Sequence, residues 1–343
     1  MFDAVDRNLS DQVINAIDSN MLELVILPTE KCNFRCTYCY ENFEKGLMNA
    51  YVIDSVKNLI TRRAPNLGHL HISWFGGEPL LACNAIYDIL DHVKMVQSEN
   101  GALKFSSGMT TNGYFLNRKN LISLTSKGVR FFQITLDGYQ DDHDRYRRRF
   151  SGDYKTFDKI WSNLLNMKNT DLEFSVCIRI HHTPATLNAI ETLIKNVNSS
   201  FSGDRRFSVF IRPISKLGGK DDNNISTYAT YADGVAASEH LISMVEDLNI
   251  VRVEENYICY AAKPNSFVIR QDGSIGKCTV ALYNDINVVG QINPDGSIRL
   301  NHKLSNWVDG ILDDDIQFLN CPWSVLKKQG VNQETVTANS VDV

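Results

Sequence analysis

Short apolar runs alternate with amphipathic segments along the first two thirds of the chain. The apolar runs predict six strands, at residues 23–29, 69–75, 104–112, 130–137, 173–180 and 206–214. The segments between them repeat apolar residues every three or four positions and predict helices near 52–64, 82–99, 118–127, 156–168 and 185–198. We expect Thr156 to cap the fourth helix and Gly128 to close the third. Strands that alternate with helices predict a parallel sheet, either open and doubly wound or curved into a partial barrel.

The two faces of the strands favour the barrel. In 173–180 the apolar residues Phe174, Val176, Ile178 and Ile180 alternate with Ser175, Cys177 and Arg179, and 132–137 repeats this alternation. A doubly wound sheet covered by helices on both faces should be apolar on both. One polar face instead predicts a (β/α)6 barrel, open on one side, whose outside packs on helices and whose lumen holds polar groups around a ligand. An antiparallel sheet with one wet face fits the helical crossovers poorly.

The pattern changes after residue 215. Residues 215–226 are polar and rich in glycine, which predicts a loop, and a helix over about 230–249 follows. Two strand-like runs then flank Gln271-Asp272-Gly273, which predicts a hairpin. We expect a helical lead-in, the barrel, a linker with its helix, a small α+β domain and a disordered tail over 1–21, 22–215, 216–252, 253–330 and 331–343. No separate domain for binding a peptide leader is expected before the barrel.

Composition and charge narrow the function classes. The chain has 343 residues, of which 43% are hydrophobic, enough for a packed core. A net charge of −5 and the lack of a basic patch interleaved with aromatic residues argue against nucleic acid as a partner. No apolar run is long enough to span a membrane, and the N-terminus lacks the features of a signal peptide, so we expect a cytoplasmic protein. In that reducing compartment the eight cysteines are expected to be ligands, reactive thiols or core residues rather than disulfides.

Three cysteines lie on one loop directly after the first predicted strand, at Cys32, Cys36 and Cys39. No pair of them could form a disulfide without leaving an odd thiol. The carboxyl end of a strand is where ligand sites gather in parallel α/β folds. Three thiolates suit an iron–sulfur cluster that takes its fourth ligand from elsewhere. Zinc is the alternative, although structural zinc usually comes with paired C-x2-C motifs.

The segment "CNFRCTYC" resembles the C-x3-C-x2-C signature of radical S-adenosylmethionine (SAM) enzymes, including the aromatic Tyr38 before its last cysteine. The segment "WFGGEP" is similar to the Gly-Gly-Glu-Pro segment of that family, here residues 76–79. Later, "TTNGYFL" (110–116) and "ITLDGYQDDHDRYR" (134–147) resemble strand ends of the subgroup that modifies peptides and proteins. The resemblance covers residues 22–215.

This resemblance implies that Cys32, Cys36 and Cys39 hold a [4Fe–4S] cluster whose fourth iron binds SAM. An electron from a reductant such as flavodoxin or ferredoxin would then release a 5′-deoxyadenosyl radical. Gly76 and Gly77 would let the backbone approach SAM, whose amino group would meet nearby carbonyls or Glu78. The other candidates for the SAM site are Tyr38, Pro79, Thr111, Asn112, Thr135, Asp137, Arg147 and Arg179. For Arg179, Asp137 is an alternative partner to the carboxylate of SAM. We expect His143 to be structural and most of 145–149 to be a solvated helix face.

A second group of cysteines lies in the C-terminal region. Cys259 and Cys278, in the spacing C-x13-G-x4-C, resemble the opening of the SPASM or twitch extensions that carry auxiliary iron–sulfur clusters. After Cys278 the chain has only Cys321, where a full SPASM extension has several more cysteines. We therefore expect at most one auxiliary cluster, with an unknown fourth ligand. A zinc site or a degenerate domain without metal is the alternative.

Of the remaining cysteines, Cys83 is expected in the core, and Cys177 either fills space or donates a hydrogen atom in the lumen. The resemblance implies an enzyme that modifies a ribosomally made precursor peptide. Oxidative cross-linking within the peptide, of a cyclophane or thioether type, is the favoured reaction. Peptide epimerisation with Cys177 as donor and sulfatase-type maturation are the alternatives. An electron-transfer or metal-binding module without enzymatic activity would release no 5′-deoxyadenosine.

Overall fold

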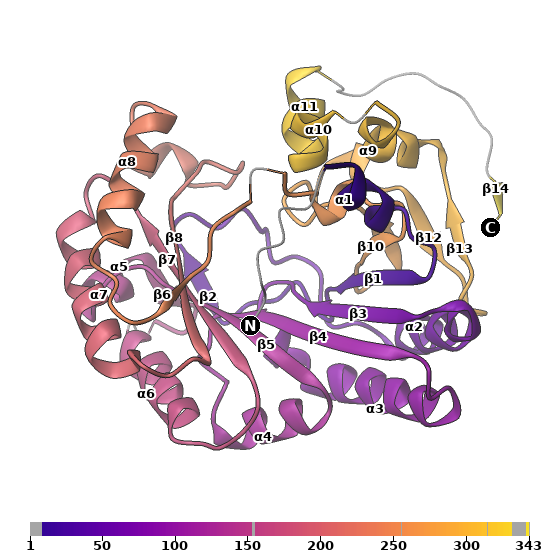
Figure 1. The fold of residues 1–343 in the computed structure, drawn as a ribbon, viewed down its shortest axis with the longest axis horizontal. Coiled ribbons are helices and arrows are strands. Elements are labelled where there is room, and N and C mark those ends of the chain that lie inside the picture. The colour runs from indigo at the N-terminus through magenta and orange to yellow at the C-terminus, as the bar shows by residue number, and fades with distance from the viewer. Residues whose placement is uncertain (1–8, 153–154, 255, 314, 331–340, 343) are drawn as a thin grey trace.

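The fold is known from a computed structural model that describes residues 9–152, 155–254, 256–313, 315–330 and 341–342. Six parallel strands form a curved sheet with helices on its outer side (Figure 1). In spatial order they are β1 (Met21–Ile26), β3 (His69–Trp74), β4 (Lys104–Thr111), β5 (Val129–Leu136), β7 (Ser175–His182) and β8 (Phe207–Pro213). All six predicted strands are confirmed, with ends that differ by a few residues.

Helices connect these strands and cover the outer face of the sheet. They are α2 (Ala50–Arg63), α3 (Cys83–Glu99), α4 (Arg118–Ser126), α6 (Phe157–Lys168) and α7 (Leu187–Phe201), and all five were predicted. The lead-in contains α1 (Leu9–Ala16). Along β5, Phe132, Ile134 and Leu136 are fully buried against the helices, whereas Gln133 on the other face keeps some exposure. The predicted partial barrel with a polar inner face is therefore confirmed.

The predicted helix over 230–249 is too long. Helix α8 ends at Ile242 (Tyr231–Ile242), and Asp247 has a φ of 50°, which a right-handed helix does not allow. The chain instead returns to the sheet as β9 (Asn249–Ile250), parallel to β8. The linker before α8 lies against the cysteine loop, because a Cβ on Gly219 would be 2.6 Å from the carbonyl oxygen of Cys39.

The expected cap of α6 is also different. The hydroxyl of Thr156 does not cap the helix but donates to Asp144 Oδ1 at 2.9 Å and to the carbonyl of Arg147 at 2.9 Å. The same carboxylate oxygen accepts the backbone N–H groups of Thr156 and Phe157, both at 2.8 Å. The cap of α6 therefore comes from α5 (Asp141–Tyr146), an element that spacing within 156–168 cannot reveal.

The C-terminal region continues the same sheet. The predicted hairpin is confirmed as β10 (Ser266–Ile269) and β11 (Ser274–Gly276). Strand β10 pairs in parallel with β1, with Glu23 opposite Ser266 and Ile26 opposite Ile269. Beyond β11 the sheet adds β12 (Gly290–Ile292), β13 (Ile298–Leu300) and β14 (Val341–Asp342), and three short helices pack beside it, α9 (Ser305–Val308), α10 (Ile316–Asn320) and α11 (Pro322–Lys328). Apart from β14, the predicted tail lies outside the described residues.

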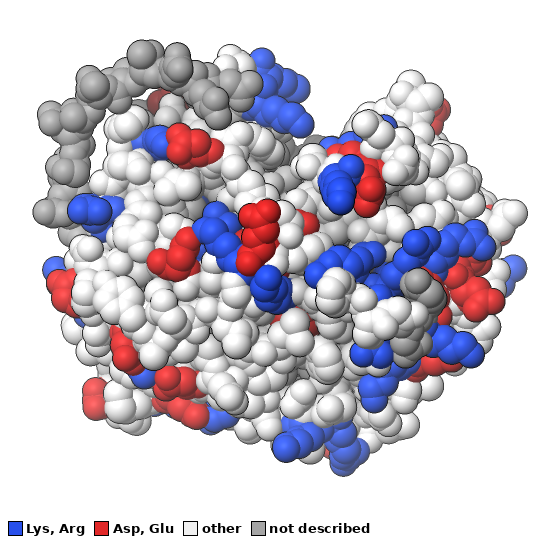
Figure 2. All heavy atoms as spheres, turned by 180° about the vertical axis from the view of Figure 1, so that it is seen from behind, with Lys and Arg blue, Asp and Glu red and all other residues white. Residues whose placement is uncertain are grey.

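Basic side chains gather on one side of the face seen in Figure 2, where α5 and β6 (Arg147–Arg149) lie in Figure 1. Arg145 and Arg148 are exposed there and line a hollow of about 490 Å³ together with Asp141, Asp144 and Lys155. None of the helices in the described part of the chain combines the length and the hydropathy needed to cross a lipid bilayer.

Candidate functional site

The cysteine loop leaves the carboxyl end of β1 and is fixed by a small sheet of its own. Strand β2 (Phe34–Cys36) pairs antiparallel with β6, which places Cys36 opposite Arg147. The expected helix is wrong for Arg148 and Arg149, because both belong to strand β6, although Arg148 is exposed as expected. Arg147, which was excepted from that expectation, is buried. The guanidinium of Arg35 lies over the rings of Phe43 and Phe150, at 4.2 and 4.3 Å from their centroids. The loop is thus a packed element rather than a free connection.

The three thiols of this loop suit a cationic cofactor. Cys32, Cys36 and Cys39 are partly buried, and burial raises the pKa of each, to about 12 for Cys39. Cys36 further raises the pKa of the other two, so the thiols lie close enough to repel one another as thiolates. A bound metal centre removes this repulsion, and the donor set fits a [4Fe–4S] cluster held by three cysteines. Within the described ranges no three His, Cys, Asp or Glu side chains are arranged as ligands of one metal ion.

Gly76 and Gly77 pack against the start of the cysteine loop. A Cβ on Gly76 would be 2.2 Å from the carbonyl oxygen of Thr29, and one on Gly77 would be 2.4 Å from that of Lys31. Gly76 also has a φ of 123°, which side chains rarely adopt. The two glycines therefore bring β3 and the loop together, a packing role that the sequence did not reveal.

Glu78 joins the glycines to the end of β4. Its Oε1 accepts the N–H of Leu80 at 3.0 Å and the hydroxyl of Thr111 at 2.7 Å, and its Oε2 accepts the N–H of Asn112 at 2.8 Å. Asn112 in turn donates to Asn33 Oδ1 at 2.8 Å and lies 3.9 Å from Cys32 Sγ. The hydroxyl of Thr111 therefore donates its hydrogen bond to Glu78, whereas the side chain of Asn112 contacts the cysteine loop. Pro79 follows as the first residue of a 3₁₀ turn.

A second polar group surrounds Asp137 at the end of β5. The hydroxyl of Tyr38 donates to Asp137 Oδ2 and accepts from Arg147 Nη1 at 2.5 Å. Arg147 lies 3.4 Å from Asp137 Oδ2, and His181 Nδ1 lies 3.2 Å from Asp137 Oδ1. Burial alone would raise the pKa of Asp137, but Arg147 and His181 hold it well below its usual range. Asp137 is thus an ionised carboxylate that orients Tyr38 and Arg147 beside the cysteines.

The other lumen candidates lie on β5 and β7, with Cys177 near the amino end of β7. Thr135 is 8% exposed on β5. Cys177 is buried on β7, and burial raises its pKa to about 11, so it stays a thiol at neutral pH. Arg179 forms no ion pair with Asp137 or with any other acid in the part of the chain that the structure describes. His143 is structural, as expected: it is buried, accepts the N–H of Asp137 at 3.3 Å and lies edge-on to Phe157.

The structure also brings the C-terminal cysteines together. Burial raises the pKa of Cys278 to about 12 and of Cys259 to about 11, and Cys321 adds to both shifts. Cys259 and Cys278 flank the β10–β11 hairpin, and Cys321 is exposed at the start of α11. Tyr40 is influenced by both groups of thiols. Its pKa is raised by burial and further by Glu41, by Tyr260, by Cys39 of the first group and by Cys278 of the second. A charge on either group would therefore act on this tyrosine.

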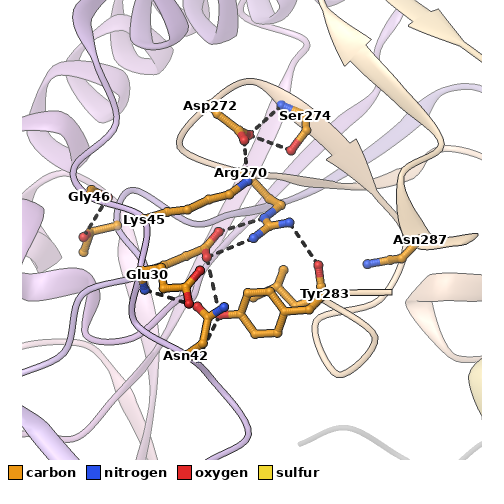
Figure 3. Close-up of polar contacts among 12 residues, drawn as sticks. Glu30, Asn42, Lys45, Gly46, Arg270, Asp272, Ser274, Tyr283 and Asn287 are labelled. Carbon is orange, nitrogen blue, oxygen red and sulfur yellow. Dashed lines mark hydrogen bonds and ion pairs between the residues drawn. The ribbon is translucent and has the colours of Figure 1, made fainter. Parts of the chain in front are cut away.

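A buried ion pair clamps the cysteine loop to the hairpin (Figure 3). Arg270 binds both carboxylate oxygens of Glu30, at 2.7 and 2.9 Å, and donates to the carbonyl of Leu282 at 3.0 Å. Tyr283 adds its hydroxyl at 3.4 Å from Glu30 and accepts the N–H of Asn42 at 3.1 Å. At the rim of this clamp Lys45 pairs with Asp272. A bidentate pair of this kind fixes orientation as well as distance.

Sequence reasoning missed Glu30, Arg270, His181 and Tyr40. Each carried a weak signal: Glu30 precedes the cysteine loop, Arg270 directly precedes the predicted turn, His181 follows Arg179 on the polar face, and Tyr40 follows Cys39. The sequence could not show which residues they contact, because Glu30 and Arg270, and likewise His181 and Asp137, are distant in the chain. These residues meet through the pairing of β1 with β10 and of β5 with β7.

Comparison with known proteins agrees with this geometry. A cysteine-type anaerobic sulfatase-maturating enzyme of Clostridium novyi is 24% identical to this chain over 344 residues, which cover 90% of this chain and 87% of that enzyme. The solved structure of anSMEcpe with bound AdoMet and the Kp18Cys peptide matches with a TM-score of 0.65 and 20% identity, over 88% of this chain and 84% of that chain. SuiB of Streptococcus suis, bound to its precursor peptide SuiA, matches with a TM-score of 0.59 and 16% identity, over 90% and 70%.

The family model of the Radical SAM superfamily matches residues 26–197, which contain the cysteine loop, the Gly76–Gly77 contact and the strands from β3 to β7. The chain therefore belongs to the radical SAM superfamily.

Proposed function

We propose that this radical SAM enzyme modifies a ribosomally made peptide by oxidative cross-linking within that peptide, of the cyclophane or thioether type. Two of its structural neighbours have bound peptides, anSMEcpe the Kp18Cys peptide and SuiB the precursor peptide SuiA. The observation that carries the proposal is the second group of thiols, in which Cys321 raises the pKa of both Cys259 and Cys278, and in which Cys278 acts on Tyr40 as Cys39 of the first group does.

The family uses a [4Fe–4S] cluster and SAM, which together supply a 5′-deoxyadenosyl radical when they are bound. In this chain Cys32, Cys36 and Cys39 would hold the cluster. Residues 76–79, Asn112 and Thr135 would line the SAM site, and Tyr38, Asp137 and Arg147 would orient polar groups there.

Cross-linking requires an acceptor for the electron that the peptide loses. The peptide would lose one hydrogen atom to the radical, giving 5′-deoxyadenosine, and would then lose one proton and one electron as the new carbon–carbon or carbon–sulfur bond forms. A cluster held by Cys259, Cys278 and Cys321 is the acceptor that this balance needs, and the charges of Cys39 and Cys278 both act on Tyr40. A reductant such as flavodoxin or ferredoxin would supply the electron that begins each turnover.

Peptide epimerisation is the second candidate, and Cys177 is the observation that favours it. This lumen thiol stays protonated, since burial raises its pKa to about 11, so it can donate a hydrogen atom to a peptide radical. Sulfatase-type maturation, the activity named for the C. novyi relative, is a third. It is less favoured because Cys321 is the only cysteine after Cys278.

The experiment combines peptide mass with loss of the second thiol group. A peptide encoded beside the gene is co-expressed with the enzyme, in ordinary and in deuterated water. Cross-linking predicts a loss of about two mass units, because two hydrogens leave the peptide. Replacing Cys259 and Cys278 by alanine should then leave SAM cleavage largely intact and abolish this mass loss. An unchanged mass in ordinary water, together with one deuterium fixed at carbon in deuterated water, would instead support epimerisation. Cys177→Ala should then remove that deuterium label.

A further inference from the structure

Two arginines meet over one aromatic ring on the inner side of the sheet. Arg179 on β7 lies opposite Phe210 on β8, and Arg212 lies two positions further along β8, opposite His181. Their guanidinium carbons are 5.9 and 5.8 Å from the centroid of the Phe210 ring. Burial lowers the pKa of Arg179, and the positive charge of Arg212 lowers it further. Two like charges thus share a site that is partly closed to water.

Neither arginine has an acidic partner among the described residues. No ion pair or hydrogen bond involves either side chain there, and the buried Nε of Arg179 has no hydrogen-bond acceptor. Asp137, the acid on the neighbouring strand, is already held by Tyr38, Arg147 and His181. A guanidinium removed from water without a partner, as in Arg179, is costly, and the like charge of Arg212 beside it adds to the cost. An anion that enters the lumen would offset this cost.

We propose that Arg179 and Arg212 together bind a carboxylate of the peptide substrate and so select peptides with an acidic group beside the modified residue. This inference rests on the proposed function. Guanidinium groups bind carboxylates through paired hydrogen bonds, which fixes both the position and the orientation of the bound group. Arg212 is exposed and Arg179 is half-buried, so the pair leads from the solvent toward the lumen.

The carboxylate of SAM is the other source of the same chemistry, and Arg147 is better placed for it. Arg147 is directly opposite Cys36 in the pairing of β6 with β2, and its buried Nε also has no hydrogen-bond partner among the described residues. Arg179 lies instead over the ring of Phe210, and Tyr38, Tyr40 and Asp137 each raise its pKa. Two arginine sites therefore correspond to two carboxylates.

The test uses a library of random peptides displayed on phage and selected on the anaerobic holoenzyme with SAM. Selection on the wild type should enrich Asp or Glu at a fixed position, and selection on Arg179→Gln/Arg212→Gln should lose that enrichment. Arg130→Gln is the matched control, because Arg130 is exposed at the opposite end of β5, so its replacement should leave the selection unchanged.

A selected peptide is then made synthetically for binding measurements. Exchange of its Asp for Asn, or of its Glu for Gln, should weaken binding by about tenfold or more in the wild type and little in the double variant. Binding of peptides with an amidated C-terminus is compared with binding of peptides with a free C-terminus. This comparison shows whether the bound carboxylate is the C-terminal one or that of an Asp or Glu side chain.

The outcomes separate the inference from the function on which it rests. Formation of 5′-deoxyadenosine without peptide should be unchanged in the double variant. If SAM binding is lost there while peptide binding persists, the pair binds SAM and the inference is overturned. Peptides enriched without an acidic position overturn it as well, with the proposed function intact. A library that yields no binder at all overturns the two together.

Discussion

At the scale of single residues, the surroundings of each cysteine indicate its role. Cys83 Sγ donates to the carbonyl of Leu80 at 3.0 Å and packs against the core, whereas Cys32 has its pKa raised by burial and by its loop neighbours Cys36 and Cys39. Replacing Cys32, Cys36 and Cys39 together by alanine should abolish cleavage of SAM to 5′-deoxyadenosine, because no thiolate is left for the cluster. Cys83→Ser is the control and should keep iron content and cleavage. Cleavage that survives the triple replacement would contradict the assignment of the loop.

Gly76 gives a sharper test of the same loop. Gly76→Ala places a Cβ 2.2 Å from the carbonyl oxygen of Thr29 at a φ of 123°, so β3 and the loop must separate. We expect a loss of about 2–4 kcal/mol in unfolding free energy and a lower cluster content, measured by urea unfolding and iron analysis. Gly46→Ala is the control on the same loop, since nothing lies within 4 Å of its added Cβ. Equal effects of the two variants would show that the close contact does not matter.

Some features of the candidate site could be predicted from the sequence, and others could not. The three loop cysteines could be predicted because a local spacing places them together. The contact of His181 with Asp137 could not, because it depends on the register that sets Leu136 opposite Ile180. Nor could the unpaired state of Arg179, since the preference of Asp137 for Arg147 and His181 is decided by geometry across three strands.

At the scale of elements, periodicity predicted the strands and most of the helices, and it failed where a contact from outside the element decides its end. Helix α8 is the example: residues 243–249 continue the apolar pattern, yet the chain leaves the helix to pair β9 with β8. The start of α6 is another, because its cap comes from Asp144 in α5.

That cap predicts a measurable loss. Asp144→Ala removes the acceptor of two backbone N–H groups and of the Thr156 hydroxyl, so it should lower the unfolding free energy by about 1–3 kcal/mol. Asp158→Ala is the matched control, an exposed acid in the first turn of the same helix. Its cost should be below about 1 kcal/mol, as for other surface charges near a helix start. A difference of less than about 0.5 kcal/mol between the two, measured by urea unfolding, would argue against the cap.

At the scale of the whole molecule, the Glu30–Arg270 clamp joins the cysteine loop to the C-terminal region (Figure 3). Arg270→Leu leaves the carboxylate of Glu30 buried without its partner and should cost about 3–5 kcal/mol in unfolding free energy. Glu30→Leu/Arg270→Leu should recover much of that loss, because no unpaired charge remains. Lys45→Gln, which removes an exposed pair at the rim, should cost less than about 1 kcal/mol. If the double variant is no more stable than Arg270→Leu, burial of an unpaired charge is not the cause.

The pairing of β1 with β10 also has a consequence for how the chain is made. Strand β1 lies between β3 and β10, so a strand that is translated before the rest of the barrel receives its second neighbour only after residue 269 has been translated. Until then β1 exposes a row of unpaired backbone N–H and C=O groups, a template for pairing with other chains. Translation that stalls before the hairpin should therefore leave nascent chains that aggregate or recruit chaperones, although every barrel strand from β1 to β8 is already complete.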